Sequence, residues 1–405
     1  MQFNSTSLLD QVRDLHPNLK FCGEPKNAIL SVSDDLICYV LSILRNDPIV
    51  PPRMSITKWL ELLHILKAHW VLPLLYWHIG RLPDEFRPPE PIFDNMRTVF
   101  QWSRARCFHL ERQLQEIVAA FDDEGVRVVV LKGPALGRTA YPDPALRPSS
   151  DLDLLVLPDQ MSRSRTTLEG LGYKCIERRF EISRDFYNDE LFVHQKNERD
   201  KPQVELHWDL HRFSGIRRDV GVEELFERAV KVRHKAFAFE ALDPIDAFMH
   251  RAMSNAFDKA TNMRLIWVYD VASLARHLVE PDDWEILQKR SVDWRARLAV
   301  EQSLRMAQAL LGFVLPQGFR DFSAWQKPTD IELEAWSRVS RGHVNLIDHL
   351  KLCMSHSTGP YKKVRYFANL LFPSRDYMIK SYMARDRRQL YLSYARRWWK
   401  WAKEL

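Results

Sequence analysis

Hydrophobic positions in the first 120 residues recur at three- and four-residue spacing, which is the period of a helix that buries one face. This spacing predicts helices over residues 33–45, 56–79 and 93–123. Prolines between positions 48 and 52 and between 83 and 91 separate these stretches, because proline interrupts helical hydrogen bonding. We therefore expect an N-terminal helical region over residues 1–110.

The hydrophobic period changes from helical to alternating after Gly125. Short runs rich in β-branched residues, or with alternating polarity, are typical of strands. Such runs cover residues 126–131, 151–157, 190–195 and 203–211. Residues 158–171 between them have helical spacing, and helical spacing returns at 243. The pattern predicts an α+β protein with a small mixed-sheet core over 111–235 and a C-terminal helical region over 236–405.

Composition places the chain among ordinary globular proteins, with 46% hydrophobic and 28% charged residues. No uninterrupted apolar run is long enough to span a membrane, and the N-terminus lacks the pattern of a secretory signal. The five cysteines are an odd number and form no CxxC pair, which indicates reduced thiols rather than a disulfide framework or zinc site. We expect a soluble, cytoplasmic protein.

The net charge of +6 is concentrated at the C-terminus, where residues 361–405 hold 12 Lys or Arg against 3 Asp or Glu. We expect this tail to form helices that present basic residues outward. The residues expected to pack it on the core are Tyr366, Phe367, Leu370 and Leu371. Three interpretations stay open: a solvated helical face, attraction of an anionic nucleotide, or docking of an acceptor peptide or anionic surface. The docking residues would be Arg396, Arg397, Trp398, Trp399 and Trp401.

The candidate chemistry begins with the sequence DLDLLV at 151–156. Strand alternation puts Asp151 and Asp153 on one face, where two carboxylates can converge on a metal ion. The sequence VELHWDLH at 204–211 carries Glu205 and His207 on one face of a second strand. If the two strands pair, Glu205 reaches the same metal ions. Zinc ligation by His207 and His194 is a weaker alternative, because an oxygen-rich set suits Mg²⁺ better.

Glycine is sparse in this chain, yet three of the 13 glycines cluster where a strand leads into a short helix. These are Gly125, Gly133 and Gly137. A glycine turn of this kind lets backbone N–H groups face a phosphate, and Lys132 adds a positive charge beside it. Arg147, in a loop with Ser149 and Ser150, could stabilise charge on a leaving pyrophosphate.

These residues together resemble the uncharacterised nucleotidyltransferase family of the DNA polymerase beta superfamily. The motifs that carry the resemblance are LKG at 131–133, Tyr141, Arg147, DLDLLV at 151–156 and VELHW at 204–208. The resemblance is best over residues 110–215. One departure is that the superfamily turn reads Gly-Ser or Gly-Gly, whereas Lys132, Gly133 and Pro134 occupy it here.

The resemblance implies transfer of a nucleoside monophosphate from a nucleoside triphosphate, expected to be ATP, to a hydroxyl-bearing acceptor with release of pyrophosphate. The acceptor would be a small molecule, a peptide or a protein. Asp151 and Asp153 would hold two Mg²⁺ ions, and Glu205 would bind the catalytic ion and help deprotonate the acceptor. The residues expected to contact the nucleotide are Lys132, Gly133, Arg147, Ser150 and His207.

Two other classes of function compete with catalysis of nucleotide transfer. A noncatalytic nucleotide-binding or partner-binding module could share the fold, and a kinase-like enzyme could transfer phosphate to a peptide. Retention of all three acidic positions favours the nucleotidyltransferase. A nucleic-acid partner is not expected, because the sequence contains no nucleic-acid-binding motif.

Overall fold

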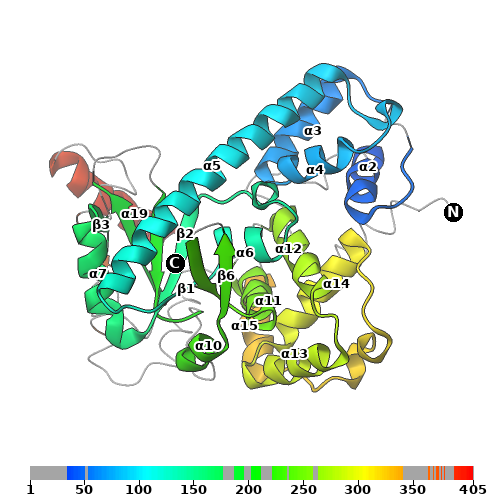
Figure 1. Ribbon diagram of the computed structural model, residues 1–405. Coiled ribbons are helices and arrows are strands. Elements are labelled where there is room, and N and C mark those ends of the chain that lie inside the picture. Colours follow the sequence, from blue (N-terminus) through cyan, green and yellow to red (C-terminus); the bar gives the residue numbers. More distant parts are fainter. Residues whose placement is uncertain are drawn as a thin grey trace. The chain divides into compact units, whose positions relative to one another are not determined.

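The chain forms two compact units, each built from separate stretches of sequence. The first unit comprises Met1–Glu111, Leu131–Ser150 and Ala241–Gly342, and the second Arg112–Val130, Asp151–Glu240 and His343–Leu405. The computed structural model (Figure 1) describes residues 34–50, 53–176, 187–195, 202–210, 221–234, 237–258, 263–340 and parts of 364–404.

The first unit is helical in its described residues. Its helices are α2 (Asp34–Arg45), α3 (Ile56–Ala68), α4 (Leu72–Ile79), α6 (Pro134–Thr139), α11 (Pro244–Met253), α12 (Leu265–Arg276), α13 (Pro281–Asp293), α14 (Arg297–Leu311) and α15 (Asp330–Ser340). Helix α12 packs against α11 and α14, and their apolar faces supply fully buried side chains such as Phe248, Val271 and Leu304. The long helix α5 (Glu90–Asp123) begins in this unit and ends in the other.

The predicted helix over residues 56–79 is two helices in the structure. Helix α3 ends at Ala68 and α4 begins at Leu72, and between them Trp70 has a φ of +61°. Pro73 lies in the first turn of α4, where its missing N–H costs no intrahelical hydrogen bond. The spacing of apolar residues does not reveal the break, because both helices bury apolar side chains at helical spacing.

The second unit contains a mixed sheet, which confirms the predicted α+β class. The described strands are β1 (Val128–Val130), β2 (Asp151–Val156), β3 (Tyr173–Cys175), β4 (Asp189–His194), β5 (Gln203–His207), β6 (Val230–His234) and β7 (Phe237–Ala241). They form one sheet in the order β3-β4-β5-β2-β1-β7-β6. Strands β2 and β5 are parallel, whereas β1 with β2 and β4 with both β3 and β5 are antiparallel.

One face of this sheet is covered by helix α7 (Met161–Gly170), which packs on β3 (Figure 1). Leu152 and Leu154 of β2 are fully buried, and Glu190 of β4 forms a buried ion pair with Arg165 of α7 at 3.1 Å. Because strand side chains alternate between faces, Asp153 of β2 and Asp189 of β4 project from the opposite face. The packing therefore leaves the acidic residues on the side away from α7.

The C-terminal tail is described mainly through helix α19 (Arg387–Glu404). Of the residues expected to pack the tail on the core, Leu371 is 40% exposed, and Tyr366, Phe367 and Leu370 lie outside the described residues. Within the described part of the chain, no helix is both long and apolar enough to cross a membrane.

Among the described cysteines, Cys38, Cys107 and Cys175 are not joined by disulfides, and Cys22 and Cys353 lie outside the described residues.

Candidate metal centre

The pairing of β2 with β5 determines which acidic residues meet. The two strands are parallel, and Asp153 stands opposite Glu205 while Leu155 stands opposite His207. Alternation along each strand puts Asp153, Glu205 and His207 on one face of the sheet. The conditional expectation that the two strands pair is confirmed.

Three side chains converge on that face. The His207 Nε2 atom lies 3.4 Å from Asp153 Oδ1 and 3.6 Å from Glu205 Oε2. One potential ligand atom from each residue lies within 4.8 Å of the other two, and no other such group of three occurs among the described residues. Asp153 and His207 are about 5% exposed, whereas Glu205 is 33% exposed. The centre is therefore enclosed at Asp153 and open to solvent at Glu205.

Opposing influences act on the His207 imidazole. Burial lowers its pKa, but hydrogen bonding to Asp153 and Glu205 and the charges of Asp153 and Asp189 raise it, with a net result of about 9. Without a metal ion, the ring therefore carries a proton that offsets part of the repulsion between the two carboxylates. A bound cation would take over this role.

The other ring nitrogen of His207 faces a buried amide. Asn188 Nδ2 lies 3.3 Å from His207 Nδ1 and donates to the backbone carbonyl of Asp209 at 3.2 Å. With the amide held in this orientation by the Asp209 carbonyl, Nδ1 can accept only when the ring is neutral, and the neutral ring then carries its proton on Nε2. In this tautomer the Nε2 proton lies on the side of the ring that faces the two carboxylates, as in residues that orient metal ligands.

Asp189 is a further acidic residue at this centre. It is buried, and its Cα stands opposite that of His207 in the antiparallel pair of β4 with β5. Asp189 and Asn188 were not predicted as site residues from the sequence. Both lie at the start of a strand, and the local sequence does not determine how that strand aligns with β5. The only signal in the sequence is the acidic start of the strand, DEL at 189–191.

Asp151 occupies the same face of β2 as Asp153, opposite Gln203 of β5. It is half-buried and lies outside the group of three ligand atoms. His194, considered as a zinc ligand, also lies outside that group and packs edge-on against Tyr173 with ring centroids 5.4 Å apart. The structure thus brings together Asp153, Glu205 and His207 of the predicted residues.

The remaining predicted residues belong to the first unit and are described within it. Gly133 precedes α6 with a φ of +56° and ψ of −115°, a conformation accessible to glycine but strained for other residues. Lys132 beside it is half-buried, and Ser150 is exposed with its carbonyl accepting from Arg106 at 2.7 Å.

Arg147 is a buried residue. Its guanidinium donates to both carboxylate oxygens of Asp270, at 3.3 and 3.1 Å, and the Tyr141 hydroxyl donates to Asp270 at 2.6 Å. Burial and the charge of Asp270 raise the pKa of Tyr141. Asp270 also lies 3.9 Å from Arg251, so one buried carboxylate faces two guanidinium groups. This cluster anchors the segment that leads to Asp151.

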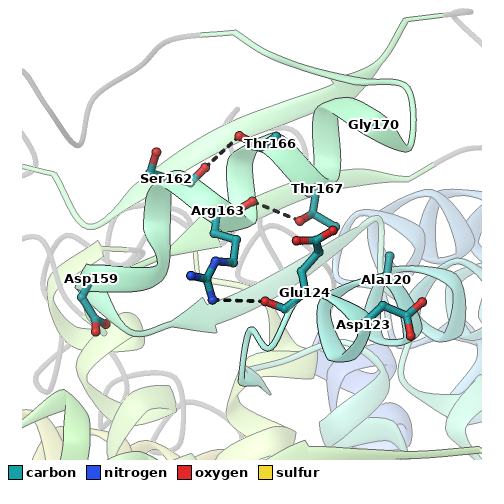
Figure 2. Close-up of a pocket in the computed structure, with 9 residues that line it drawn as sticks. All are labelled: Ala120, Asp123, Glu124, Asp159, Ser162, Arg163, Thr166, Thr167 and Gly170. Atoms are coloured by element: carbon teal, nitrogen blue, oxygen red, sulfur yellow. Dashed lines mark hydrogen bonds between the residues drawn. The ribbon is translucent and has the colours of Figure 1, made fainter.

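A hollow of about 630 Å³ lies on the α7 side of the second unit (Figure 2). It is lined by Ala120, Asp123, Glu124, Asp159, Ser162, Arg163, Thr166, Thr167 and Gly170. Figure 2 shows Thr166 and Thr167 bonding back to carbonyls of their own helix, and Arg163 donating to the Glu124 carbonyl. None of the predicted site residues lines this hollow.

The acidic centre fits a hard divalent cation. Two carboxylates from adjacent strands supply oxygen ligands, which suit Mg²⁺ and Mn²⁺, and a histidine that donates to them completes a usual surrounding for such ligands. The exposed side of Glu205 leaves room for further ligands from substrate or water.

Comparison with known proteins assigns the chain to one family. The family model of uncharacterised nucleotidyltransferases matches residues 55–312, which is more than half of the chain. Among curated proteins, the search found no match.

Proposed function

Since the chain belongs to the uncharacterised nucleotidyltransferase family, we propose that it transfers a nucleoside monophosphate from a nucleoside triphosphate, expected to be ATP, to a hydroxyl-bearing acceptor. The observation that carries the proposal is the convergence of Asp153, Glu205 and His207 on one face of the sheet. The acceptor would be a small molecule, a peptide or a protein side chain.

In the proposed reaction, the acceptor oxygen bonds to the α-phosphorus while the bond from that phosphorus to the bridging oxygen of pyrophosphate breaks. Asp151, Asp153 and Glu205 would hold two Mg²⁺ ions, which supply charge stabilisation for the attacking and leaving oxygens. Glu205 is the most exposed of the three converging residues, so its carboxylate can meet the acceptor and accept the hydroxyl proton. Pyrophosphate leaves with the electron pair of the broken bond.

His207 and Asn188 would keep the carboxylates in position. The His207 Nε2 atom faces both Asp153 and Glu205, and Asn188 lies against the other ring nitrogen. His207 remains a predicted contact of the nucleotide. Lys132, Gly133, Arg147 and Ser150 remain predicted contacts of the nucleotide, of which Lys132 and Arg147 would act on the triphosphate.

The test is incubation of the protein with Mg²⁺ and each labelled nucleoside triphosphate, followed by mass analysis of candidate acceptors and of the protein itself. An increment of one nucleoside monophosphate, with stoichiometric pyrophosphate, is expected. An increment of phosphate alone would show a kinase-like enzyme, and tight nucleotide binding without any product would show a noncatalytic module.

Two matched variants distinguish the loss of a proposed metal ligand from the loss of a negative charge elsewhere on the sheet. Glu205→Gln removes a proposed ligand at nearly constant volume and is expected to abolish product formation. Glu240→Gln changes a carboxylate on β7 of the same sheet, where Glu240 pairs with Arg127 at the surface, and is expected to retain activity. Equal turnover in the two variants would overturn the assignment.

A further inference from the structure

Helix α19 carries apolar side chains that are exposed to solvent. Tyr391 is 71% exposed, Leu392 48% and Trp399 66%. At the helical rotation of about 100° per residue, these three positions fall within an arc of roughly 100°. The exposed apolar side chains therefore form a stripe along one face of the helix.

The opposite face of α19 is the one that packs. Leu390 and Ser393 are buried, and the Tyr394 hydroxyl donates to the carbonyl of Pro373 at 2.6 Å. A helix that only covered a protein core would place polar residues on its outer face. Helix α19 instead has apolar residues on its outer face as well.

A neighbouring segment extends the exposed apolar surface. The Trp398 indole N–H donates to the Leu371 carbonyl at 2.8 Å, and the rings of Phe372 and Trp398 lie 5.2 Å apart. Phe372 is 61% exposed and Leu371 40%. Because these contacts join the segment to α19, the aromatic surface continues beyond the helix.

Positive charge accompanies this surface. Helix α19 contains six Lys or Arg and one acidic residue. Arg388 lies within the arc of the apolar stripe, Arg396 lies beside it, and both are exposed. The surface therefore combines aromatic residues with a net positive charge of about +5 on the helix, counted at neutral pH.

We propose that this face of α19 binds an anionic phospholipid surface. Tryptophan and tyrosine favour the boundary between headgroups and acyl chains, and arginine is attracted to anionic headgroups. An amphipathic helix of this type lies in the plane of the interface with its apolar side chains inserted. The exposed tryptophan and tyrosine side chains of the stripe favour a lipid surface over an acidic peptide, because these side chains partition to the membrane interface.

The test uses the full chain and sedimentation with vesicles. One set contains phosphatidylcholine alone, and the other contains phosphatidylcholine and phosphatidylglycerol in equal parts. The protein is expected to bind the anionic vesicles at least about tenfold more tightly, because several basic side chains contribute. Raising salt from about 0.1 M to about 1 M shortens the Debye length from about 10 to about 3 Å and should release most of it.

Paired variants locate the binding surface. Tyr391→Ser with Leu392→Ser, and separately Arg388→Glu with Arg396→Glu, should each weaken binding to anionic vesicles by about tenfold or more. The matched control is Trp102→Ser with Phe108→Ser on α5, whose side chains are 74% and 63% exposed. It should bind as the wild type does.

Three results would overturn the proposal. They are no sedimentation of the wild type with anionic vesicles, equal sedimentation with both vesicle types at low salt, or unchanged binding by both α19 variants. Retention of the wild type on immobilised polyglutamate without vesicle binding would assign the surface to an acidic protein instead. Because the wild-type salt and lipid dependence needs no substitution, the test stands even if a variant misfolds.

Discussion

Three side chains lie within a few ångströms of one another at the acidic centre, and the two carboxylates help to raise the pKa of His207. His207 lies within 3.6 Å of the carboxylates of Asp153 and Glu205, and Asp189 adds a fourth charge nearby. The proton on His207 and a divalent cation are alternative ways of offsetting this negative charge. The chemistry of the centre therefore depends on pH and on metal together.

The first prediction concerns pH in the presence of a chelator. The pKa of His207 is raised from its ordinary value of 6.5 to about 9, so its contribution to stability is fully present below pH 6.5 and is lost as pH rises through 9. The free energy of unfolding should fall over that window. His207→Gln should flatten the dependence in denaturant titrations, and an equally steep fall in that variant would contradict the assignment.

The second prediction compares the two aspartates of β2. Asp153→Ala should abolish nucleotidyl transfer and also weaken Mn²⁺ binding, because Asp153 supplies a converging ligand atom. Asp151→Ala should likewise abolish transfer if Asp151 holds the metal ions as proposed. We expect each substitution to lower the rate of transfer by more than the roughly 10- to 100-fold loss that is usual for residues that only contact a metal ligand. Near-normal turnover of either variant with Mg²⁺ would show that the two-metal assignment is wrong.

At the scale of secondary-structure elements, the segment from 131 to 150 is constrained at several points. It begins with the turn at Gly133, and α6 follows. The Ser103 hydroxyl donates to the Ala145 carbonyl at 2.6 Å, and Asp270 of α12 accepts from Tyr141 and Arg147. The segment is therefore held by side chains from α5 and α12, which are distant in sequence.

The third prediction tests the turn. Gly133→Ala should destabilise the protein by about 1–3 kcal/mol, because its backbone conformation is strained for a residue with Cβ. Gly170→Ala at the end of α7 is the matched control, since an added Cβ meets nothing within 4 Å. It should be neutral or slightly stabilising. Chemical denaturation measures both, and equal midpoints would refute the role of the turn.

The fourth prediction tests the buried cluster around Asp270. Asp270→Asn removes the charge that faces Arg147 and Arg251, and both guanidinium groups are buried. Losing one member of a buried ion pair costs about 3–5 kcal/mol. Asp282→Asn on the exposed first turn of α13 serves as the control and should change stability little. A small effect of Asp270→Asn in urea unfolding would show that the pairs contribute little.

At the scale of the whole molecule, a cation bound to the acidic centre should stabilise the native state. A ligand that binds only the folded protein adds about 2.7 kcal/mol at one hundred times its dissociation constant. The fifth prediction is therefore that saturating Mg²⁺ raises the melting temperature and that chelation reverses the rise. Glu205→Gln should melt at the same temperature with and without Mg²⁺, whereas Glu240→Gln should respond as the wild type does.

The sequence by itself determined the features that arise from local backbone geometry. Alternation in DLDLLV and VELHW assigned Asp153 and Glu205 to polar strand faces, and the period of apolar residues located most long helices, because side-chain direction follows from the backbone period. Short strands such as β3 and β6 were not predicted. Their alternation spans too few residues to stand out.

Only the tertiary structure decided which of these residues meet. The register that sets Asp153 opposite Glu205, and Asp189 opposite His207, depends on pairing between strands that local sequence does not encode. Arg147 pairs with Asp270, which lies 123 residues away in the sequence. The exposed face of α19 is known only because the structure shows that Leu390 and Ser393 are buried on the other face. Local periodicity assigns a side chain to a face of its element, whereas its neighbours on that face come from chain segments that folding brings together.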